Sequence, residues 1–294
     1  MSVPMSVPID LDIFKQWLIN KEFSASYIKN IMPCARKYGY LIYSDSLRDL
    51  ELLSNWQRTH AVKALIMLSK YVGTYTQFKD RLNQHGIKMY RTNGLTAFLR
   101  ILNANNKDTL LWLEQTLPYL RQNEQLFAKF LKLSGLRVSE GITSFNLCIK
   151  LAKEGRLSEY YDSSLNVLCH FKYPKLFIRR SKACYITFIK PQFLEEITHS
   201  QPVTYPSIRK KLERSKIPMR LNELRDIFGT HLVNSGILEI EQNLCCGRIP
   251  VSIFIRHYWS PKLKELGNRV FRALDLMEQQ QAQQQAETPL AIVQ

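Results

Sequence analysis

The stretch that decides the fold runs from Arg220 to Val270 and reads RLNELRDIFGTHLVNSGILEIEQNLCCGRIPVSIFIRHYWSPKLKELGNRV. Arg225, Arg248 and Tyr258 follow one another in it at separations of 23 and 10 residues. Apolar residues recur with helical spacing between the two arginines, which predicts helices there. Arginine keeps its charge and grips phosphate oxygens with two parallel hydrogen bonds. Two arginines and one tyrosine hydroxyl are therefore groups that could bind a phosphodiester and attack its phosphorus.

A third arginine lies upstream, in the segment LSGLRVSE from Leu133 to Glu140. It is Arg137, in a Gly-Leu-Arg-x-x-Glu setting. A tyrosine hydroxyl titrates near ~10 in isolation, so a tyrosine that attacks phosphate needs cations that stabilise the phenolate and the pentacovalent phosphorus. Gly135 permits the tight turn that brings Arg137 towards a bound phosphate, and Glu140 is expected to hold the helix or the arginine in place.

The sequence motifs around Arg137, Arg225 and Tyr258 resemble those of the tyrosine recombinases. They are most similar to the motifs of the integrases of archaeal viruses and plasmids. The resemblance makes Arg137 and Arg225 the two box arginines, Arg248 the late His/Trp position and Tyr258 the nucleophile. It extends beyond these four positions to Phe228, Thr230, His231, Leu232 and Gly236. Specific motifs cover the C-terminal two thirds of the chain, whereas the N-terminal third is similar only in helical character.

Two further positions complete the site that the resemblance implies. Asn222 stands where the family has His or Lys, and an amide donates hydrogen bonds but neither carries charge nor shuttles a proton. Lys182 lies in an expected β-hairpin, where a family lysine protonates the 5′-oxygen leaving group. Neighbouring arginines lower the pKa of such a lysine and make it a better acid. Lys175, Arg179 and Arg180 compete with Lys182 for this role.

Composition points to the same class of partner. The chain of 294 residues has 41 Lys+Arg against 25 Asp+Glu, a formal charge of +16, and 45% apolar residues. These values predict a folded protein of about two domains that binds a polyanion. Charge alone also suits membrane surfaces or ribosomes, but the Arg/Tyr set favours DNA. We find no apolar run long enough to cross a bilayer and no secretory leader, so we expect the protein in the cytoplasm or nucleoid of the host.

The six cysteines show no Cys-x-x-Cys pair and no second ligand pair at zinc spacing. We therefore predict neither a disulfide nor a zinc site. The sequence also has no phosphate-binding glycine loop and no carboxylate cluster of the two-metal type. No cofactor is expected.

The predicted fold class is α+β, mainly helical with a small β-sheet or hairpin. We expect a disordered leader at 1–9, a helical core-binding domain at 10–92, a linker region at 93–106, a catalytic domain at 107–278 and a flexible Gln-rich tail at 279–294. The linker is placed near Tyr90 to Leu95, with the Asn-rich segment after Ile101 as the alternative.

Several element predictions are specific enough to test. Asp10 or Asp12, Ser24 and Ser54 are expected helix caps, and Pro33 is expected to kink or interrupt its helix. Helices are predicted over 142–153 and 157–171. A period-two pattern after Pro174 predicts strands at Lys175–Arg180 and Cys184–Ile189, with Lys182 at the hairpin tip.

Basic residues outside the boxes are expected on the DNA backbone, where contacts position the protein without reading sequence. The candidates are Lys63, Lys70, Arg179, Arg180, Arg209, Lys210 and Lys211.

The sequence thus predicts a site-specific recombinase or integrase that acts on double-stranded attachment sites through a 3′-phosphotyrosyl intermediate, without metal or ATP. Four protomers are expected on two paired sites, from a monomer or dimer in solution. The alternatives are an enzyme like type IB topoisomerases that religates the same strand, a catalytically inactive DNA-binding protein of the same fold, and a transposase with loose target choice.

Overall fold

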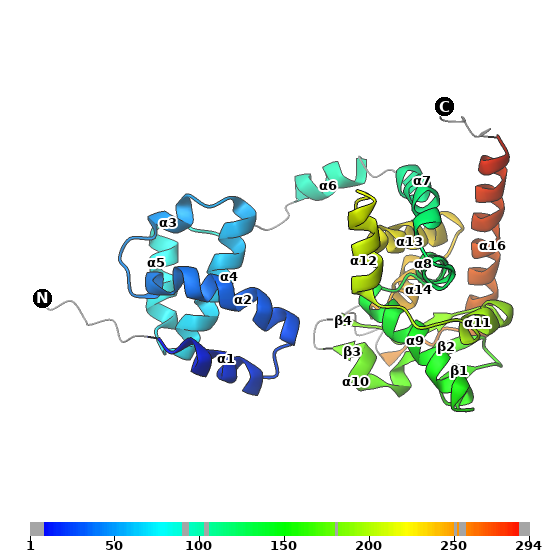
Figure 1. Cartoon of the computed structure of the whole chain (residues 1–294), viewed down its shortest axis with the longest axis horizontal. Helices are drawn as coiled ribbons and strands as arrows, with labels where there is room; N and C mark the ends of the chain where they lie inside the picture. The colour runs from blue at the N-terminus through cyan, green and yellow to red at the C-terminus, as the bar shows by residue number, and fades with distance from the viewer. Residues whose placement is uncertain are drawn as a thin grey trace, which may run out of the picture. The chain divides into compact units, whose positions relative to one another are not determined.

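The computed structural model describes residues 9–89, 94–102, 106–179, 182–249, 252 and 257–287. The chain divides into two compact units, Met1–Asn103 and Ala104–Gln294, each with its own hydrophobic core. The predicted class is confirmed at the coarse level, since the chain is mainly helical with small antiparallel sheets (Figure 1). The division lies inside the expected linker region 93–106, at the Asn-rich segment.

The first unit is built of helices. They are α1 (Leu11–Asn20), α2 (Ala25–Tyr38), the 3-10 turn η1 (Gly39–Ile42), α3 (Arg48–Glu51), α4 (Asn55–Tyr71), α5 (Tyr75–Gln84) and α6 (Gly94–Leu102). The expected caps are confirmed: Asp10 accepts from the backbone of Asp12 and Ile13, and Ser24 accepts from that of Tyr27. Ser54 and Gln57 form a capping box that begins α4.

The core of this unit forms around α4, which packs against α2, α5 and η1. Phe14, Leu65 and Phe78 are fully buried in it. The expected interruption at Pro33 does not occur, because α2 continues through this residue. Pro33 is exposed, so water reaches the carbonyl that loses its helical donor, while Ile28, Ile31 and Ala35 hold the other face in the core.

The second unit combines helices with two small sheets. Its helices are α7 (Asn106–Thr116), α8 (Gln122–Ser134), α9 (Val138–Lys153), α10 (Pro174–Phe177), α11 (Pro191–Thr198), α12 (Tyr205–Arg214), α13 (Leu224–Asn234), α14 (Glu239–Cys245) and α16 (Leu263–Glu287). Its 3-10 turns are η2 (Leu117–Tyr119), η3 (Leu157–Glu159), η4 (His170–Lys172) and η5 (Leu221–Glu223). Its strands are β1 (Tyr161–Asp162), β2 (Val167–Cys169), β3 (Ile178–Arg179), β4 (Lys182–Ala183) and β5 (Ile186–Phe188).

The strands correct three predictions. The helix expected over 157–171 is absent, because β1 and β2 form an antiparallel hairpin there whose turn includes Asn166 at φ 53°. β5 pairs with β2, in the order β1-β2-β5. The strand expected from Lys175 begins only at Ile178, since Pro174 starts a helical turn. β3 pairs with β4, with Arg179 opposite Lys182, so a hairpin forms in the expected region. Its second strand is Lys182–Ala183 rather than the expected Cys184–Ile189, of which Ile186–Phe188 form β5 and pair with β2.

Two helices occupy segments expected to be irregular. α6 lies within the predicted linker region, and α16 continues to Glu287, through residues 279–287 of the predicted flexible tail. Gln and Ala favour helix, which explains the extension. Leu266, Val270 and Leu274 of α16 are buried in the core of their own unit.

A chain of buried hydrogen bonds crosses this core. The Tyr160 hydroxyl donates to Ser144 Oγ at 3.0 Å and lies 2.6 Å from Nδ1 of His170, whose Nε2 is 2.8 Å from Oγ1 of Thr187. All four side chains are buried. Burial lowers the pKa of His170 to about 3, so the folded protein holds the imidazole neutral.

This histidine should weaken the fold in mild acid. Its folded pKa lies below the unfolded value of about 6.5, so its contribution is complete above that value and is lost as pH falls towards about 3. Between pH 7 and 4.5 we expect a loss of about 2–3 kcal/mol in the free energy of urea unfolding. His170→Gln should lack this component, and an identical pH dependence in the two proteins would contradict the assignment.

Candidate functional site

The candidate site is assembled by the guanidinium of Arg225, in the first turn of α13. Its Nη1 donates to the carbonyl of Gly135 at 2.7 Å, and its Nη2 donates to the carbonyl of Cys246 at 2.6 Å. These carbonyls follow the last turns of α8 and α14, where helix carbonyls lack internal donors and carry partial negative charge. A guanidinium has five N–H donors, so these two bonds do not exhaust it.

Both acceptors stand two residues before another predicted arginine. Gly135 precedes Arg137, which begins α9. Cys246 precedes Arg248, which ends the motif that closes α14: its backbone N–H donates to Asn243 at 2.7 Å, and that of Gly247 donates to Leu244 at 2.9 Å. This is the Schellman pattern of helix termination. One side chain of α13 therefore fixes the two backbone turns that carry the other arginines.

Because Arg225 holds the turns that lead to Arg137 and Arg248, the three cations lie near one another. Burial lowers the pKa of Arg225 from its ordinary value, and the neighbouring charges of Arg137 and Arg248 lower it further. Arg137 is partly exposed, with 24% of its side chain accessible, and Arg248 is exposed. Clustering like charges costs free energy, which an anion bound among them would recover.

Glu140 is the carboxylate of this cluster. It is 2% exposed, and its carboxylate accepts from Nη1 of Arg137 at 2.7 Å and from the Arg137 backbone N–H at 3.2 Å. It also accepts from Nη2 of Arg179 at 3.2 Å. Glu140 thus orients Arg137, as expected, and also ties the β3–β4 hairpin to the start of α9.

Two glycines allow the backbones to meet. Gly135 has φ 61°, and a Cβ there would lie 2.2 Å from the ring of Phe228 on α13. Gly247 has φ 67°, and a Cβ there would lie 2.2 Å from the carbonyl oxygen of Ala183. The first contact brings α8 against α13, and the second brings the Arg248 turn against β4.

Lys182 is brought to this region by the second contact. It is the first described residue of β4, precedes Ala183 and is exposed. The tip itself, Arg180 and Ser181, lies outside the described residues. Lys182 therefore flanks the tip and is joined through the adjoining backbone to the turn that carries Arg248.

Tyr258 and Asn222 lie on the surface of the same unit. Tyr258 is 73% exposed, and its ring lies 6.4 Å from that of His257. Residues 253–256, which lead to it, are outside the described part. Asn222 is exposed on η5, directly before α13. The contacts described for the three arginines thus assemble them with Glu140 and the Lys182 hairpin, while the approach of Tyr258 is not defined by them.

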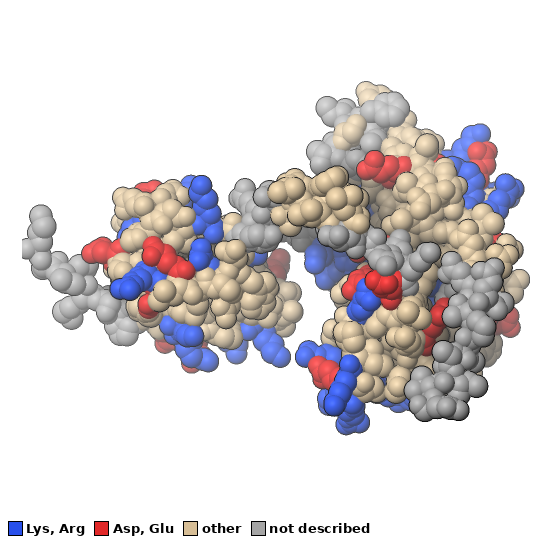
Figure 2. Space-filling model, turned by 90° about the horizontal axis from the view of Figure 1, so that it is seen from above, with Lys and Arg blue, Asp and Glu red and all other residues tan. Residues whose placement is uncertain are grey.

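The residues predicted to contact the DNA backbone differ in their surroundings. Lys63, Lys70 and Lys210 are exposed, and Arg209 is exposed with an ion pair to Glu213 at 2.6 Å. Lys211 instead bonds Glu124, which is fully buried. Figure 2 shows lysine and arginine side chains gathered in several groups on the visible surface of both units.

The hydrogen-bonded cluster around Glu124 was not predicted from the sequence. Glu124 accepts from Ser207 Oγ at 2.8 Å, from Arg121 Nη2 at 2.9 Å and from Lys211. Burial raises its pKa, but these bonds outweigh it and lower the value to about 2. Glu124 therefore anchors the basic helix α12 on α8. Ser207 and Lys211 are 83 and 87 residues away from Glu124 along the chain, so no local pattern indicates these two contacts.

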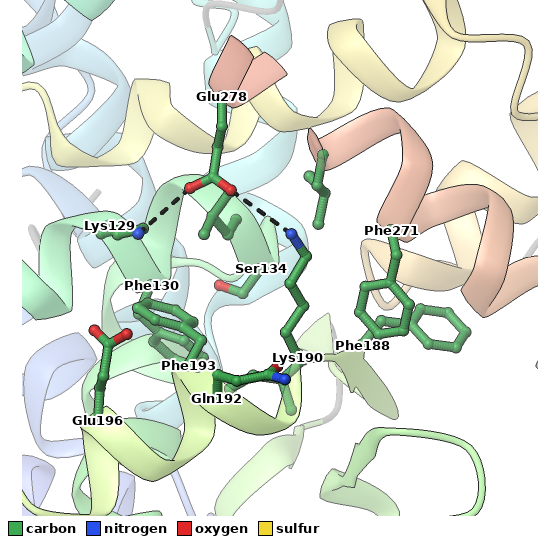
Figure 3. A pocket seen from close by; sticks show the side chains of 13 residues that line it. Lys129, Phe130, Ser134, Phe188, Lys190, Gln192, Phe193, Glu196, Phe271 and Glu278 are labelled. Atoms are coloured by element: carbon green, nitrogen blue, oxygen red, sulfur yellow. Dashed lines mark ion pairs between the residues drawn. The ribbon is translucent and has the colours of Figure 1, made fainter. Parts of the chain in front are cut away.

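A separate cavity of about 210 Å³ lies among α8, α11, α16 and the end of β5. Phenylalanines line it, and Glu278 reaches between Lys129 and Lys190, with N–O distances of 3.4 and 3.8 Å (Figure 3). Among its lining residues is none of the predicted site residues. The ion pairs hold α16 to its own unit.

The described part of the chain has no group of three His, Cys, Asp or Glu side chains that could hold a metal ion. The six cysteines are present as thiols. Burial raises the pKa of Cys184 and Cys245, as is typical of cysteines that serve as small core residues. None of the described helices has the length and apolar character to cross a membrane.

No family model matches this chain, and no curated protein sequence matches it.

The contact of Gly247 with β4 can be tested against a matched glycine. Gly236 also has positive φ, at 80°, but nothing lies within 4 Å of a Cβ built there. Gly236→Ala should cost only the backbone strain of about 1–2 kcal/mol. Gly247→Ala should cost about 1–3 kcal/mol more, because its methyl group meets the β4 backbone. Urea unfolding measures both, and equal losses would contradict the close approach.

Proposed function

We propose that the protein is a site-specific DNA recombinase of the tyrosine type, which cuts and rejoins strands through a 3′-phosphotyrosyl intermediate without metal or ATP. The observation that carries the proposal is the guanidinium of Arg225, which holds the turns before Arg137 and Arg248 by bonds of 2.7 and 2.6 Å. Residues 90 and 21 positions away along the chain are thereby gathered into one cationic site. Such a site suits a phosphate.

In the proposed reaction, the Tyr258 Oη forms a bond to the scissile phosphorus and the bond from phosphorus to the 5′-oxygen breaks. Arg137, Arg225 and Arg248 stabilise the charge that develops on the equatorial oxygens, and Asn222 adds a neutral donor. Removing one preorganised donor of this kind costs on the order of 10²–10³ in rate. Lys182 gives its proton to the 5′-oxygen, and the phenol proton passes to solvent, because Asn222 has no basic group.

The phosphotyrosyl bond conserves the energy of the phosphodiester, so the reverse attack by a 5′-hydroxyl rejoins a strand. Attack by the original strand gives relaxation, as in a topoisomerase of type IB. Attack by a strand from a second site gives recombination, which needs two sites and a proposed assembly of four protomers. Dependence of product formation on two sites on the DNA separates these alternatives.

The first test uses purified protein, supercoiled plasmid and EDTA, with products separated on denaturing gels. Relaxed circles and protein-linked DNA are expected from the unaltered chain and from Tyr119→Phe, a control at a tyrosine that is also exposed, at 54%. Tyr258→Phe should give neither product. Adducts that persist in Tyr258→Phe would remove the assigned nucleophile.

Tight binding without an adduct, on plasmid and on candidate attachment duplexes, would instead favour the catalytically inactive DNA-binding protein. Asn222→His would then be the first variant to examine, because it restores the proton-carrying group of the family.

The role of Lys182 is tested with a leaving group that needs no proton. Lys182→Ala should slow cleavage of an ordinary duplex by about 10²–10⁴, and a duplex with a 5′-bridging sulfur at the scissile position should restore the rate. Lys175→Ala, at another exposed lysine, is the control and should behave as the unaltered chain. A sulfur duplex that fails to rescue Lys182→Ala, or that rescues Lys175→Ala instead, would reassign the acid.

A further inference from the structure

The two central helices of the first unit carry only positive charge. Residues 9–89 include twelve Lys+Arg and seven Asp+Glu, yet α2 (Ala25–Tyr38) and α4 (Asn55–Tyr71) contain no Asp or Glu. These two helices pack on each other. The acidic residues lie on α1, α3, α5 and the connecting turns. A duplex lying against α4 would therefore meet no carboxylate from that helix or from α2.

The accessible face of α4 is a single stripe. Trp56, His60, Lys63, Met67 and Lys70 follow one another at intervals of four and three residues, which places them on one side of a helix. Trp56, Lys63 and Lys70 are exposed, and His60 and Met67 are half-buried. The opposite side, with Val62, Leu65 and Ser69, is buried in the core. We call these five residues the α4 stripe.

Two arginines of the first unit, Arg58 and Arg81, use their guanidinium groups for hydrogen bonds to backbone carbonyls. Arg58 donates to the carbonyls of Leu50 and Glu51 at 2.9 and 2.8 Å, and to that of Leu53. Arg81 donates to the carbonyls of Ser44 at 3.0 Å and Ile42. Both guanidinium groups therefore stabilise loops. Lys63 and Lys70 remain as the outward cations of α4, and Lys70 Nζ lies 4.9 Å above the ring of Tyr75.

Trp56 is unusual for a surface position. Its side chain is 70% exposed, although an indole is among the largest apolar groups a protein can bury. Its ring lies 4.3 Å from that of His60, which restricts its orientation. It stands in the first turn of α4, between the two residues of the Ser54–Gln57 capping box. A large aromatic group is thus presented at a well-fixed helix end, in line with two lysines.

We propose that the α4 stripe enters the major groove of duplex DNA, with Lys63 and Lys70 on phosphates and Trp56 against base edges. This rests on the proposed function in that the partner is DNA, but it assigns a role in sequence discrimination to one residue. A helix with side chains is about 10–12 Å across, and the major groove is about 12 Å wide. The three exposed residues are spaced about 10 Å apart along α4, so the stripe extends for about 20 Å along the helix.

Trp56 suits base contact better than phosphate contact, because an indole has one donor and no charge. Its apolar edge can pack on thymine methyl groups, which carry sequence information in the major groove. The lysines supply charge without sequence information. The two kinds of residue therefore predict different experimental signatures.

The test uses the full chain with Tyr258→Phe, so that binding is measured without a covalent step. Duplexes are first selected from a randomised pool of 30 base pairs by this protein, and affinity is then measured against salt concentration. Lys63→Gln and Lys70→Gln should each reduce the slope of log K against log salt by about 0.9, on selected and random duplexes alike. Lys15→Gln, at an exposed lysine of α1, should leave the slope unchanged.

Trp56→Ala should keep the slope and lose about tenfold in affinity for the selected duplex, with little change on random duplex. Leu52→Ala removes another exposed apolar side chain, 75% accessible, and should have no effect. A Trp56→Ala chain that binds both duplexes as before, or lysine variants with unchanged slopes, would overturn the proposal. A stripe that instead binds another protein would give that result.

The two proposals fail separately. Trp56-dependent DNA binding by a chain that never forms an adduct would leave the α4 stripe in place and remove the recombinase. Adduct formation and DNA binding that are unchanged by substitution of Trp56, Lys63 and Lys70 would leave the recombinase in place. They would remove the role assigned to the α4 stripe.

Discussion

The second unit depends on one side chain that is bonded to two helix ends. Arg225 donates to the carbonyls that follow α8 and α14, at 2.7 and 2.6 Å. Each bond satisfies an orphan acceptor and places a cation at the negative end of a helix dipole. A lysine has no planar fork with which to hold two carbonyls in this way. The same two bonds set the positions of the backbone from which Arg137 and Arg248 project.

The arrangement has a cost that is informative about function. Three neighbouring guanidinium groups repel one another, and Glu140 and the two helix-end carbonyls offset this repulsion only in part. Positive φ at Gly135 and Gly247 and the close backbone contacts there add further constraint. A structural role would not require such a concentration of positive charge at an accessible surface. Strain and like charge gathered at one place are expected where a ligand of opposite charge completes the site.

Local patterns predicted much of this, and long-range contacts account for what they missed. Caps at Asp10, Ser24 and Ser54 follow from hydrogen bonding within one turn, and the sequence therefore predicted them. The helix expected over 157–171 failed because pairing of β2 with β5 overrides local apolar spacing. The strand predicted from Lys175 begins only at Ile178, because Pro174 starts a helical turn that ends at Phe177.

The candidate site shows the same division. Spacing identified the three arginines and Glu140, and the structure brings them together. Sequence spacing could not show that Gly247 lies against the backbone of β4. Nor could it show that Lys211 forms an ion pair with buried Glu124 instead of projecting into solvent. These contacts join residues distant in sequence, which become neighbours only when the core forms. Arg180 lies outside the described residues, and the role of Tyr258 remains a prediction.

The central claim is that Tyr258 becomes covalently linked to DNA, and mass spectrometry of the trapped adduct tests it most directly. After nuclease and trypsin digestion, the peptide HYWSPK, residues 257–262, should carry a nucleotide attached through its 3′-phosphate to Tyr258. A nucleotide on any other residue, or an unmodified peptide in a sample that contains the adduct, would contradict the account.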